Sequence, residues 1–133
     1  MSRLALFGIT VVPFVFILVF WVVGSDKNKD SFVDIKVPEL SDAARHGRTV
    51  LNGTCAACHG KDASGTDKGP PLIHPVYRPS HHADGAIHLA IANGVRQHHW
   101  NYGAMPPQPD IDKADIPAII AFIREVQRAN RIK

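Results

Sequence analysis

Two cysteines and one histidine, Cys55, Cys58 and His59, are the residues whose types and spacing point most directly to chemistry. Two thiols three positions apart can add to the two vinyl groups of a haem as thioethers, and the histidine that follows can ligate the iron. The spacing therefore predicts covalent attachment of a haem within one short turn.

The same motif allows three other interpretations. A thioredoxin-like redox pair needs a βαβ context, and no strand-like run lies near Cys55. A zinc site is the closer alternative, because fifteen residues separate Cys58 from His74, although six residues separate His74 from His81 rather than the usual three to five. A structural disulfide between the two cysteines would close only a small loop and would add little stability.

Met105 is a second candidate iron ligand. It is the only methionine besides Met1, and it lies in a glycine- and proline-rich loop, followed directly by Pro106 and Pro107. A lone methionine is ordinarily a core residue, but a rigid loop downstream of the haem motif favours the role of sixth ligand. A thioether opposite an imidazole raises the reduction potential and closes the iron to substrates, which favours electron transfer over catalysis.

Residues 69–72 read Gly-Pro-Pro-Leu and cannot lie inside a helix, because consecutive prolines lack N–H donors and hold an extended backbone. Such a rigid segment presents carbonyl groups in fixed positions. An axial histidine needs this kind of support, since its second ring nitrogen must be held by a hydrogen bond.

Three helices are predicted for the C-terminal part of the chain, over residues 41–52, 85–93 and 112–130. Ser41 and Asp84 are the expected N-caps of the first two helices, Gly53 and Gly94 are their expected ends, and Pro117 is placed in the first turn of the third. The apolar stripe of the third helix comprises Ile116, Ile119, Ile120, Ile123 and Val126, widened by Phe122. Its C-terminal basic residues, Arg124, Arg128, Arg131 and Lys133, are expected on a solvated face.

Residues 4–23 carry no charge and would span ~30 Å as a helix, the thickness of a bilayer core. We therefore expect a transmembrane anchor at 1–24, a flexible linker at 25–37 and a folded domain at 38–133. A cleaved signal peptide is the alternative, but its apolar region usually has only ~7–15 residues. Arg3 favours a domain on the periplasmic side of a bacterial inner membrane, whereas Lys27 and Lys29 oppose this orientation.

The composition limits the function classes. The 133 residues carry a net charge of only +3 and contain no basic run, so neither the charge nor its distribution indicates a nucleic-acid partner. Both cysteines lie in the one motif, which leaves none for a disulfide framework. A covalently held haem is a large apolar group that can supply the centre of a small core.

Taken together, residues 38–133 resemble a class I c-type cytochrome of the short, membrane-anchored, monohaem type. The resemblance rests on these residues in this order: Gly47-Arg48, Cys55-Ala56-Ala57-Cys58-His59-Gly60, Gly69-Pro70-Pro71-Leu72, Ala104-Met105-Pro106-Pro107, and the amphipathic last helix. It implies an all-α domain of four or five helices around one covalent haem c.

The resemblance also implies roles for individual residues. The Pro70 carbonyl would accept the ring N–H of His59, Leu72 would pack on the haem, and Met105 would be the distal ligand. Gly47 would lie where the first and last helices cross, near Phe122. Arg96, Trp100 and Tyr102 fall where partners of the haem propionates or of the distal side are found.

The function implied is one-electron transfer between transient redox partners, with no bond of a substrate made or broken. The partners would be a quinol-oxidising complex or a dehydrogenase on one side and a terminal oxidase or reductase on the other. A haem-based ligand sensor, a peroxidase-like enzyme and a fixed subunit of a larger redox complex are the alternatives.

Two histidine pairs, His81-His82 and His98-His99, fit the resemblance less well. Three interpretations are open. The pairs could form a polar rim on loops, or they could bind copper or zinc, since imidazole suits both metals. One of the histidines could also replace Met105 as the ligand of the iron.

Overall fold

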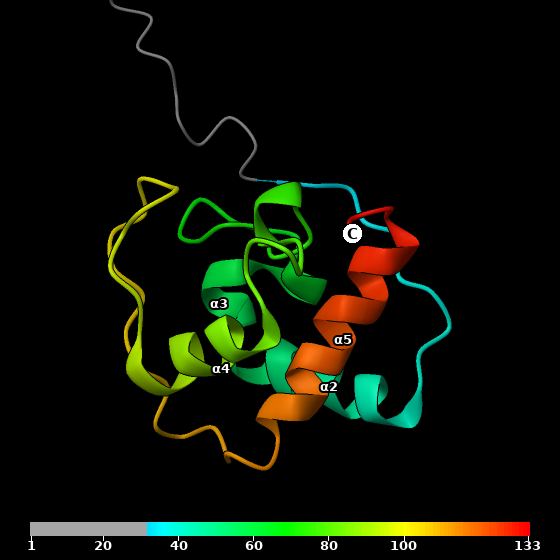
Figure 1. The fold of residues 1–133 in the computed structure, drawn as a ribbon. Coiled ribbons are helices and arrows are strands. Elements are labelled where there is room, and N and C mark those ends of the chain that lie inside the picture. The colour runs from blue at the N-terminus through cyan, green and yellow to red at the C-terminus, as the bar shows by residue number, and fades with distance from the viewer. Residues whose placement is uncertain (1–31) are drawn as a thin grey trace, which may run out of the picture.

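The computed structural model describes residues 32–133, which form helices joined by loops (Figure 1). In chain order these are α2 (Asp42–Thr54), α3 (Ala56–His59), the 3₁₀ helices η1 (Lys61–Ala63) and η2 (Pro75–Tyr77), α4 (Asp84–Asn93) and α5 (Ile116–Ala129). Over residues 32–133 the one β pairing is an isolated bridge between Val95 and Met105. The predicted all-α class is therefore confirmed for the folded domain.

The predicted membrane anchor, residues 1–24, lies outside the described residues. Among residues 32–133 the structure contains no helix that is both long and apolar enough to cross a bilayer.

Helices α2 and α5 cross at Gly47, and Figure 1 shows α5 passing in front of α2. A Cβ atom on Gly47 would lie only 1.9 Å from the carbonyl oxygen of Ala118 and 2.6 Å from the backbone nitrogen of Ile119. The close approach expected at Gly47 is present, and it involves the turn of α5 before Phe122 rather than Phe122 itself. Glycine is required here because the two backbones leave no space for a side chain.

The start of α2 is fixed by Ser41, as predicted. Its hydroxyl oxygen accepts a hydrogen bond from the backbone N–H of Ala44 at 3.2 Å, and the hydroxyl donates to Oε1 of Glu125 on α5 at 2.7 Å. The predicted end at Gly53 is wrong by one residue, because the helix continues through Thr54. The N–H of Cys55 then donates to the Leu51 carbonyl at 2.8 Å, which leads the chain directly into α3.

The last helix begins at Ile116 rather than at 112. Residues 112–115 instead form a turn in which the N–H of Asp115 donates to the carbonyl of Asp112 at 2.9 Å, and Pro117 occupies the first helical turn as predicted. The buried apolar residues on α5 are Ile116, Ile119, Phe122, Ile123 and Val126, which form the centre of the core together with Ala44 and Leu51 of α2.

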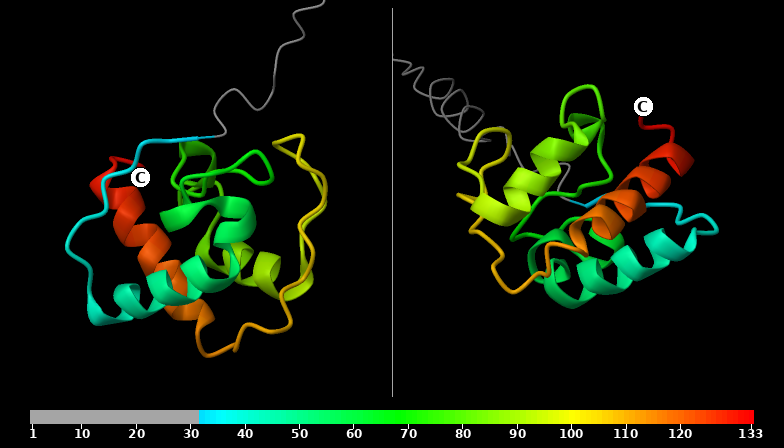
Figure 2. Two further views of the ribbon diagram at one scale, coloured as in Figure 1. Left: turned by 180° about the vertical axis from the view of Figure 1, so that it is seen from behind. Right: turned by 60° about the horizontal axis from the view of Figure 1, so that its bottom comes forward.

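Helix α4 packs against α5, and its Ile91 is buried (Figure 2). It starts at Asp84, so this residue is the first helical residue rather than the cap, and it ends at Gly94 as predicted.

Residues 33–37 of the predicted linker lie against the domain. The N–H of Lys36 donates to Oδ1 of Asn130 at 2.9 Å, and Nδ2 of Asn130 donates back to the Lys36 carbonyl at 2.8 Å. The N–H of Val33 donates a hydrogen bond to the carbonyl of Ser64 at 3.0 Å. The side chains of Ile35 and Val37 pack against the core. The chain is therefore held to the folded domain from Val33 onward.

Candidate haem site

The Cys-x-x-Cys-His motif sits at the junction of α2 and α3. Cys55 separates the two helices, and its carbonyl accepts hydrogen bonds from the N–H groups of Cys58 at 3.2 Å and His59 at 2.9 Å. This tight turn leaves Cys55 half-buried, Cys58 exposed and His59 buried. Both cysteines are free thiols rather than a disulfide, as attachment to another group requires.

The alternatives to haem attachment find no support in the described part of the chain. Within residues 32–133 no strand flanks the motif, so the βαβ context of a thioredoxin-like pair is missing. Nor do these residues form a cluster of potential metal ligands that includes Cys58. The fifteen-residue spacing from Cys58 to His74 therefore does not translate into a zinc site.

His59 is held in the orientation that an iron ligand needs. Its ring nitrogen Nδ1 lies 2.8 Å from the carbonyl oxygen of Pro70, which can only accept, so Nδ1 carries the proton and Nε2 keeps a free lone pair. Burial lowers the pKa of His59 below its ordinary value, and the bond to Pro70 opposes this only in part. The ring is therefore neutral and fixed in one tautomer at physiological pH.

Met105 is positioned by backbone bonds rather than by a helix. Its N–H and carbonyl form reciprocal hydrogen bonds with Val95, each 2.9 Å long. Gly94 has a φ of 73°, and a Cβ atom there would lie 2.5 Å from the Met105 carbonyl oxygen. The end of α4 thus fixes the loop that carries Met105. This contact has no signal in the sequence, because a single bridged pair has no periodicity.

A cavity of about 280 Å³ lies between α4, α5, the motif and the Met105 loop. Its lining is mostly apolar and includes Leu51, Leu72, Ile87, Ile91, Ile119 and Ile123 together with Cys55, His59, Pro70 and Met105. A second cavity of about 130 Å³ shares Cys55, His59, Pro70 and Met105 with the first and adds Cys58. The two cavities therefore adjoin; Cys55, His59 and Met105 line both of them, and Cys58 lines the second.

The cavity also has polar groups suited to the charged propionates at the edge of a haem. The indole N–H of Trp100 is buried and makes no hydrogen bond of normal geometry within the described residues. Burial raises the pKa of the neighbouring Tyr77 phenol to about 12, although the nearby Trp100 indole opposes the rise. A buried donor that lacks a well-formed hydrogen bond is stabilised by a further acceptor, and a haem propionate would supply one. Arg96, Trp100 and Tyr102 all line this cavity.

These features together fit a haem: an apolar cleft, two thiols and an oriented imidazole on one side, a thioether on the other, and a donor without a well-formed hydrogen bond at the edge. When bound, the iron supplies a one-electron couple between its ferrous and ferric states.

A buried polar pair on α5, Arg124 and Gln127, holds the backbone of residues that line the cavity, and it was not predicted. Arg124 is only 7% exposed, so the expected solvated face is wrong at this position. Its guanidinium donates to Asp84 at 2.7 Å, to the Tyr77 carbonyl at 2.9 Å, to Gln127 at 2.6 Å and to the His82 carbonyl.

Gln127 extends this anchoring to the proline segment. Its Nε2 donates to the carbonyls of Leu72 at 3.0 Å and Tyr77 at 2.9 Å. The loop that carries the predicted haem contact Leu72 is therefore held from behind by the last helix. No sequence signal distinguishes Arg124 from the exposed arginines beside it, because three of its four acceptors lie 40 to 47 positions away in the sequence.

Residues 44–127 match the model of the Cytochrome c family. The chain belongs to the cytochrome c family. Members of this family carry covalently attached haem c, so haem c is the cofactor of this cytochrome. The chain matches no curated protein sequence significantly.

Among solved structures, this cytochrome is similar to cytochrome CL from the marine methylotrophic bacterium Methylophaga aminisulfidivorans MPT. The two share 29% sequence identity with a TM-score of 0.51, and the match covers 65% of this chain and 54% of that one. The chain thus spans about half the length of this relative, and the similarity supports the haem-binding core rather than the activity of the whole relative.

Proposed function

We propose that this cytochrome is a membrane-tethered one-electron carrier with a single haem. Cys55 and Cys58 hold the macrocycle, and His59 and Met105 are its axial ligands. The observation that carries the proposal is the convergence of these four side chains in the lining of two adjoining cavities, with the His59 tautomer set by Pro70.

Electron transfer is favoured over catalysis by the ligand pair. Histidine and methionine together fill both axial positions, so no position remains for a substrate, and the thioether raises the reduction potential. Reciprocal backbone bonds to Val95 restrain Met105. These bonds hold the loop so that the Met105 thioether stays within reach of the iron, which favours a carrier over a sensor or peroxidase in which the methionine dissociates.

The tether is inferred from the sequence of residues 1–24, which matches a bilayer-spanning helix in length and polarity. Because the chain is held to the domain from Val33 onward, only residues 25–32 connect the anchor to the domain. Eight residues reach at most ~30 Å. The haem domain would therefore work close to the periplasmic face of a bacterial inner membrane, in contact with the bilayer only through its N-terminal helix.

Its partners would be redox proteins bound briefly. Electron-transfer encounters use small interfaces, and a tether raises the local concentration of a membrane-bound partner without any new contact. We place the cytochrome between a quinol-oxidising complex or dehydrogenase and a terminal oxidase or reductase.

The experiment that tests the haem assignment is absorption spectroscopy of the full-length protein extracted from membranes, in both oxidation states. We expect a c-type spectrum that survives acid-acetone extraction, one haem per chain by pyridine haemochrome, and the weak near-infrared band of methionine bound to ferric iron. A ferric protein without this band, or a ferrous protein that binds carbon monoxide readily, would refute Met105 as the ligand.

The tether is tested separately by washing membranes with alkaline carbonate. The full-length cytochrome should stay with the pellet, and a variant that starts at residue 32 and is exported by a cleavable signal should appear in the periplasmic fraction. Release of the full-length protein by the wash would contradict the anchor and leave the haem assignment intact.

A further inference from the structure

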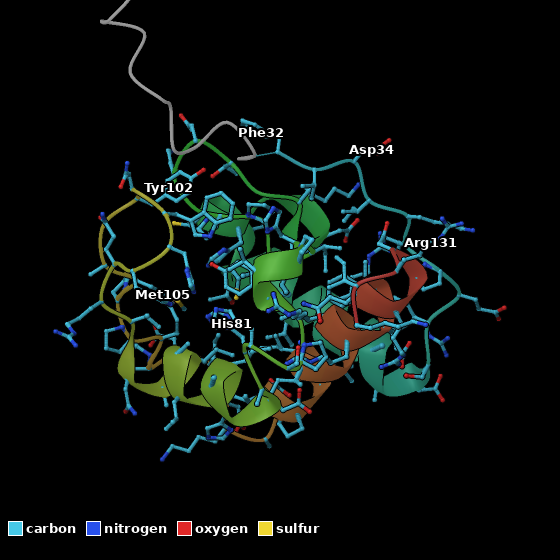
Figure 3. The ribbon with its side chains drawn as sticks, turned by 45° about the horizontal axis from the view of Figure 1, so that its top comes forward. Phe32, Asp34, His81, Tyr102, Met105 and Arg131 are labelled. Carbon is cyan, nitrogen blue, oxygen red and sulfur yellow. The ribbon has the colours of Figure 1, made fainter. Side chains whose placement is uncertain are left out.

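Four histidines from two separate loops meet at one edge of the cytochrome domain. His81 and His82 come from the loop before α4, and His98 and His99 follow α4. Their ring centroids lie 4.7 Å apart for His81 and His82, 5.1 Å for His81 and His99, and 4.2 Å for His98 and His99. Figure 3 labels His81 on the same side of the domain as Tyr102 and Met105.

Three of these rings bring their nitrogens together. One ligand nitrogen from each of His81, His82 and His99 lies within 4.8 Å of the other two. The Nε2 atoms of His81 and His99 are 3.3 Å apart. Two ligands of a tetrahedral zinc ion at 2.0–2.1 Å are separated by about 3.3 Å. This pair therefore already has the spacing of two metal ligands, and ring movements of about 1.5 Å would bring the third nitrogen to the same spacing.

Backbone carbonyls orient two of the rings. Nδ1 of His82 donates to the Val76 carbonyl at 2.8 Å, and Nδ1 of His98 donates to the Arg96 carbonyl at 2.9 Å. Each bond leaves Nε2 unprotonated and available as a ligand, which is the outer support that metal-binding histidines commonly have. The His82 backbone is itself held, because its carbonyl accepts from the buried guanidinium of Arg124.

The kind of ligand indicates the kind of metal. Imidazole binds a metal ion in its neutral form. A set of imidazoles without carboxylates suits Cu²⁺ and Zn²⁺ and does not suit Mg²⁺ or Ca²⁺.

We propose that His81, His82 and His99 form a binding site for a divalent late transition metal, Cu²⁺ or Zn²⁺, with His98 placed to complete the ligand set. The site is separate from the iron ligands. It lies at the rim of the haem cavity, because His82, His98 and His99 line that cavity while His81 does not. Metal binding here would act at the edge of the haem rather than on its iron.

The test uses the haem-loaded full-length cytochrome, made without a polyhistidine tag and stripped with chelator. Equilibrium dialysis against Zn²⁺, with zinc and iron measured by mass spectrometry, should give one zinc per iron, and Cu²⁺ should displace the zinc. His81→Ala and His99→Ala should each weaken binding by more than about 10-fold, since loss of outer-shell support alone costs about 10–100-fold.

His88→Ala is the matched control, because His88 is an exposed histidine on α4 outside the cluster. It should bind zinc as the wild type does. The proposal is overturned if the haem-loaded protein binds no stoichiometric zinc, if the His81 and His99 variants bind as tightly as the wild type, or if His88→Ala weakens binding equally. The haem spectrum of each sample shows that the variant has folded, and it tests the proposed carrier function independently of zinc binding.

Discussion

The crossing of α2 and α5 at Gly47 gives a sharp stability prediction. In Gly47→Ala the new Cβ would lie 1.9 Å from the Ala118 carbonyl oxygen, whereas real Cβ atoms essentially never approach within 3.0 Å. The two helices must therefore separate by about 1 Å at their closest point. The obstacle is backbone rather than a flexible side chain, so no change of rotamer relieves it.

The expected magnitude follows from two opposing effects. Alanine gains ~1 kcal/mol over glycine in a helix interior, and overpacking a core costs about 1–3 kcal/mol. The separation also loosens contacts around Leu51 and Phe122, both fully buried, so we place the cost at or above the top of that range. The net result is a loss of about 2 kcal/mol or more, or a fall in Tm of at least about 8–16 °C for a domain of this size.

Gly53→Ala is the control, because Gly53 lies in the same helix and a Cβ atom added there would have no neighbour within 4 Å. It should raise the stability by about 0.5 kcal/mol. Both variants are compared with the wild type by urea unfolding followed by circular dichroism. If Gly47→Ala is as stable as Gly53→Ala, the helix crossing does not require glycine and the reasoning fails.

Three further predictions concern single side chains. Met105→Ala should abolish the near-infrared band and lower the reduction potential in a redox titration, because the thioether is lost from the iron; an unchanged potential would contradict the ligation. Asp62→Asn should cost about 1–2 kcal/mol at neutral pH, since it removes the negative charge and one of the two oxygens that accept from Arg48 at 2.7 and 2.8 Å. The bonds from Arg48 are the largest cause that lowers the pKa of Asp62 below its ordinary 3.8. The difference in unfolding free energy between the wild type and Asp62→Asn, measured in urea, should therefore be full above about pH 4 and vanish as the pH falls through the lowered pKa. Arg124→Met should cost about 1–3 kcal/mol in thermal unfolding, because the His82 carbonyl and the Gln127 side-chain oxygen lose their donor. Arg124→Lys should restore less than half of this, because an ammonium cannot span the same acceptors; full rescue by lysine would show that charge alone matters.

The features that can be predicted from the sequence are those with short-range signals. Ser41 is recognisable as a cap because its hydroxyl needs only a nearby N–H, and Gly94 as a helix end because no helical pattern follows it. Gly47 is informative because a glycine in a helix is costly unless something approaches it. The family itself follows from the fixed order of the haem motif, the proline segment and Met105.

The features that sequence reasoning misses depend on contacts between distant segments. Arg124 looks like its exposed neighbours until the fold supplies its acceptors. Residues 25–37 taken together are polar enough to read as a linker, although Val33, Ile35 and Val37 are apolar. The bonds that hold Lys36 come from Asn130 at the far end of the chain. The histidine pairs are visible as pairs, but their convergence depends on α4 bringing two loops together.

The two proposed iron ligands are held in different ways, and the difference bears on function. His59 is fixed through its ring by the Pro70 carbonyl, and that carbonyl lies in a segment that Gln127 holds from α5. Met105 is fixed through its backbone by Val95, while its side chain keeps its own torsional freedom. The histidine side of the iron is thus restrained by a chain of bonds that reaches the core, whereas the methionine side depends on one bridge at the end of α4. Any displacement of a ligand should therefore begin with Met105, and loosening the bridge between Val95 and Met105 should open the iron before any change reaches His59.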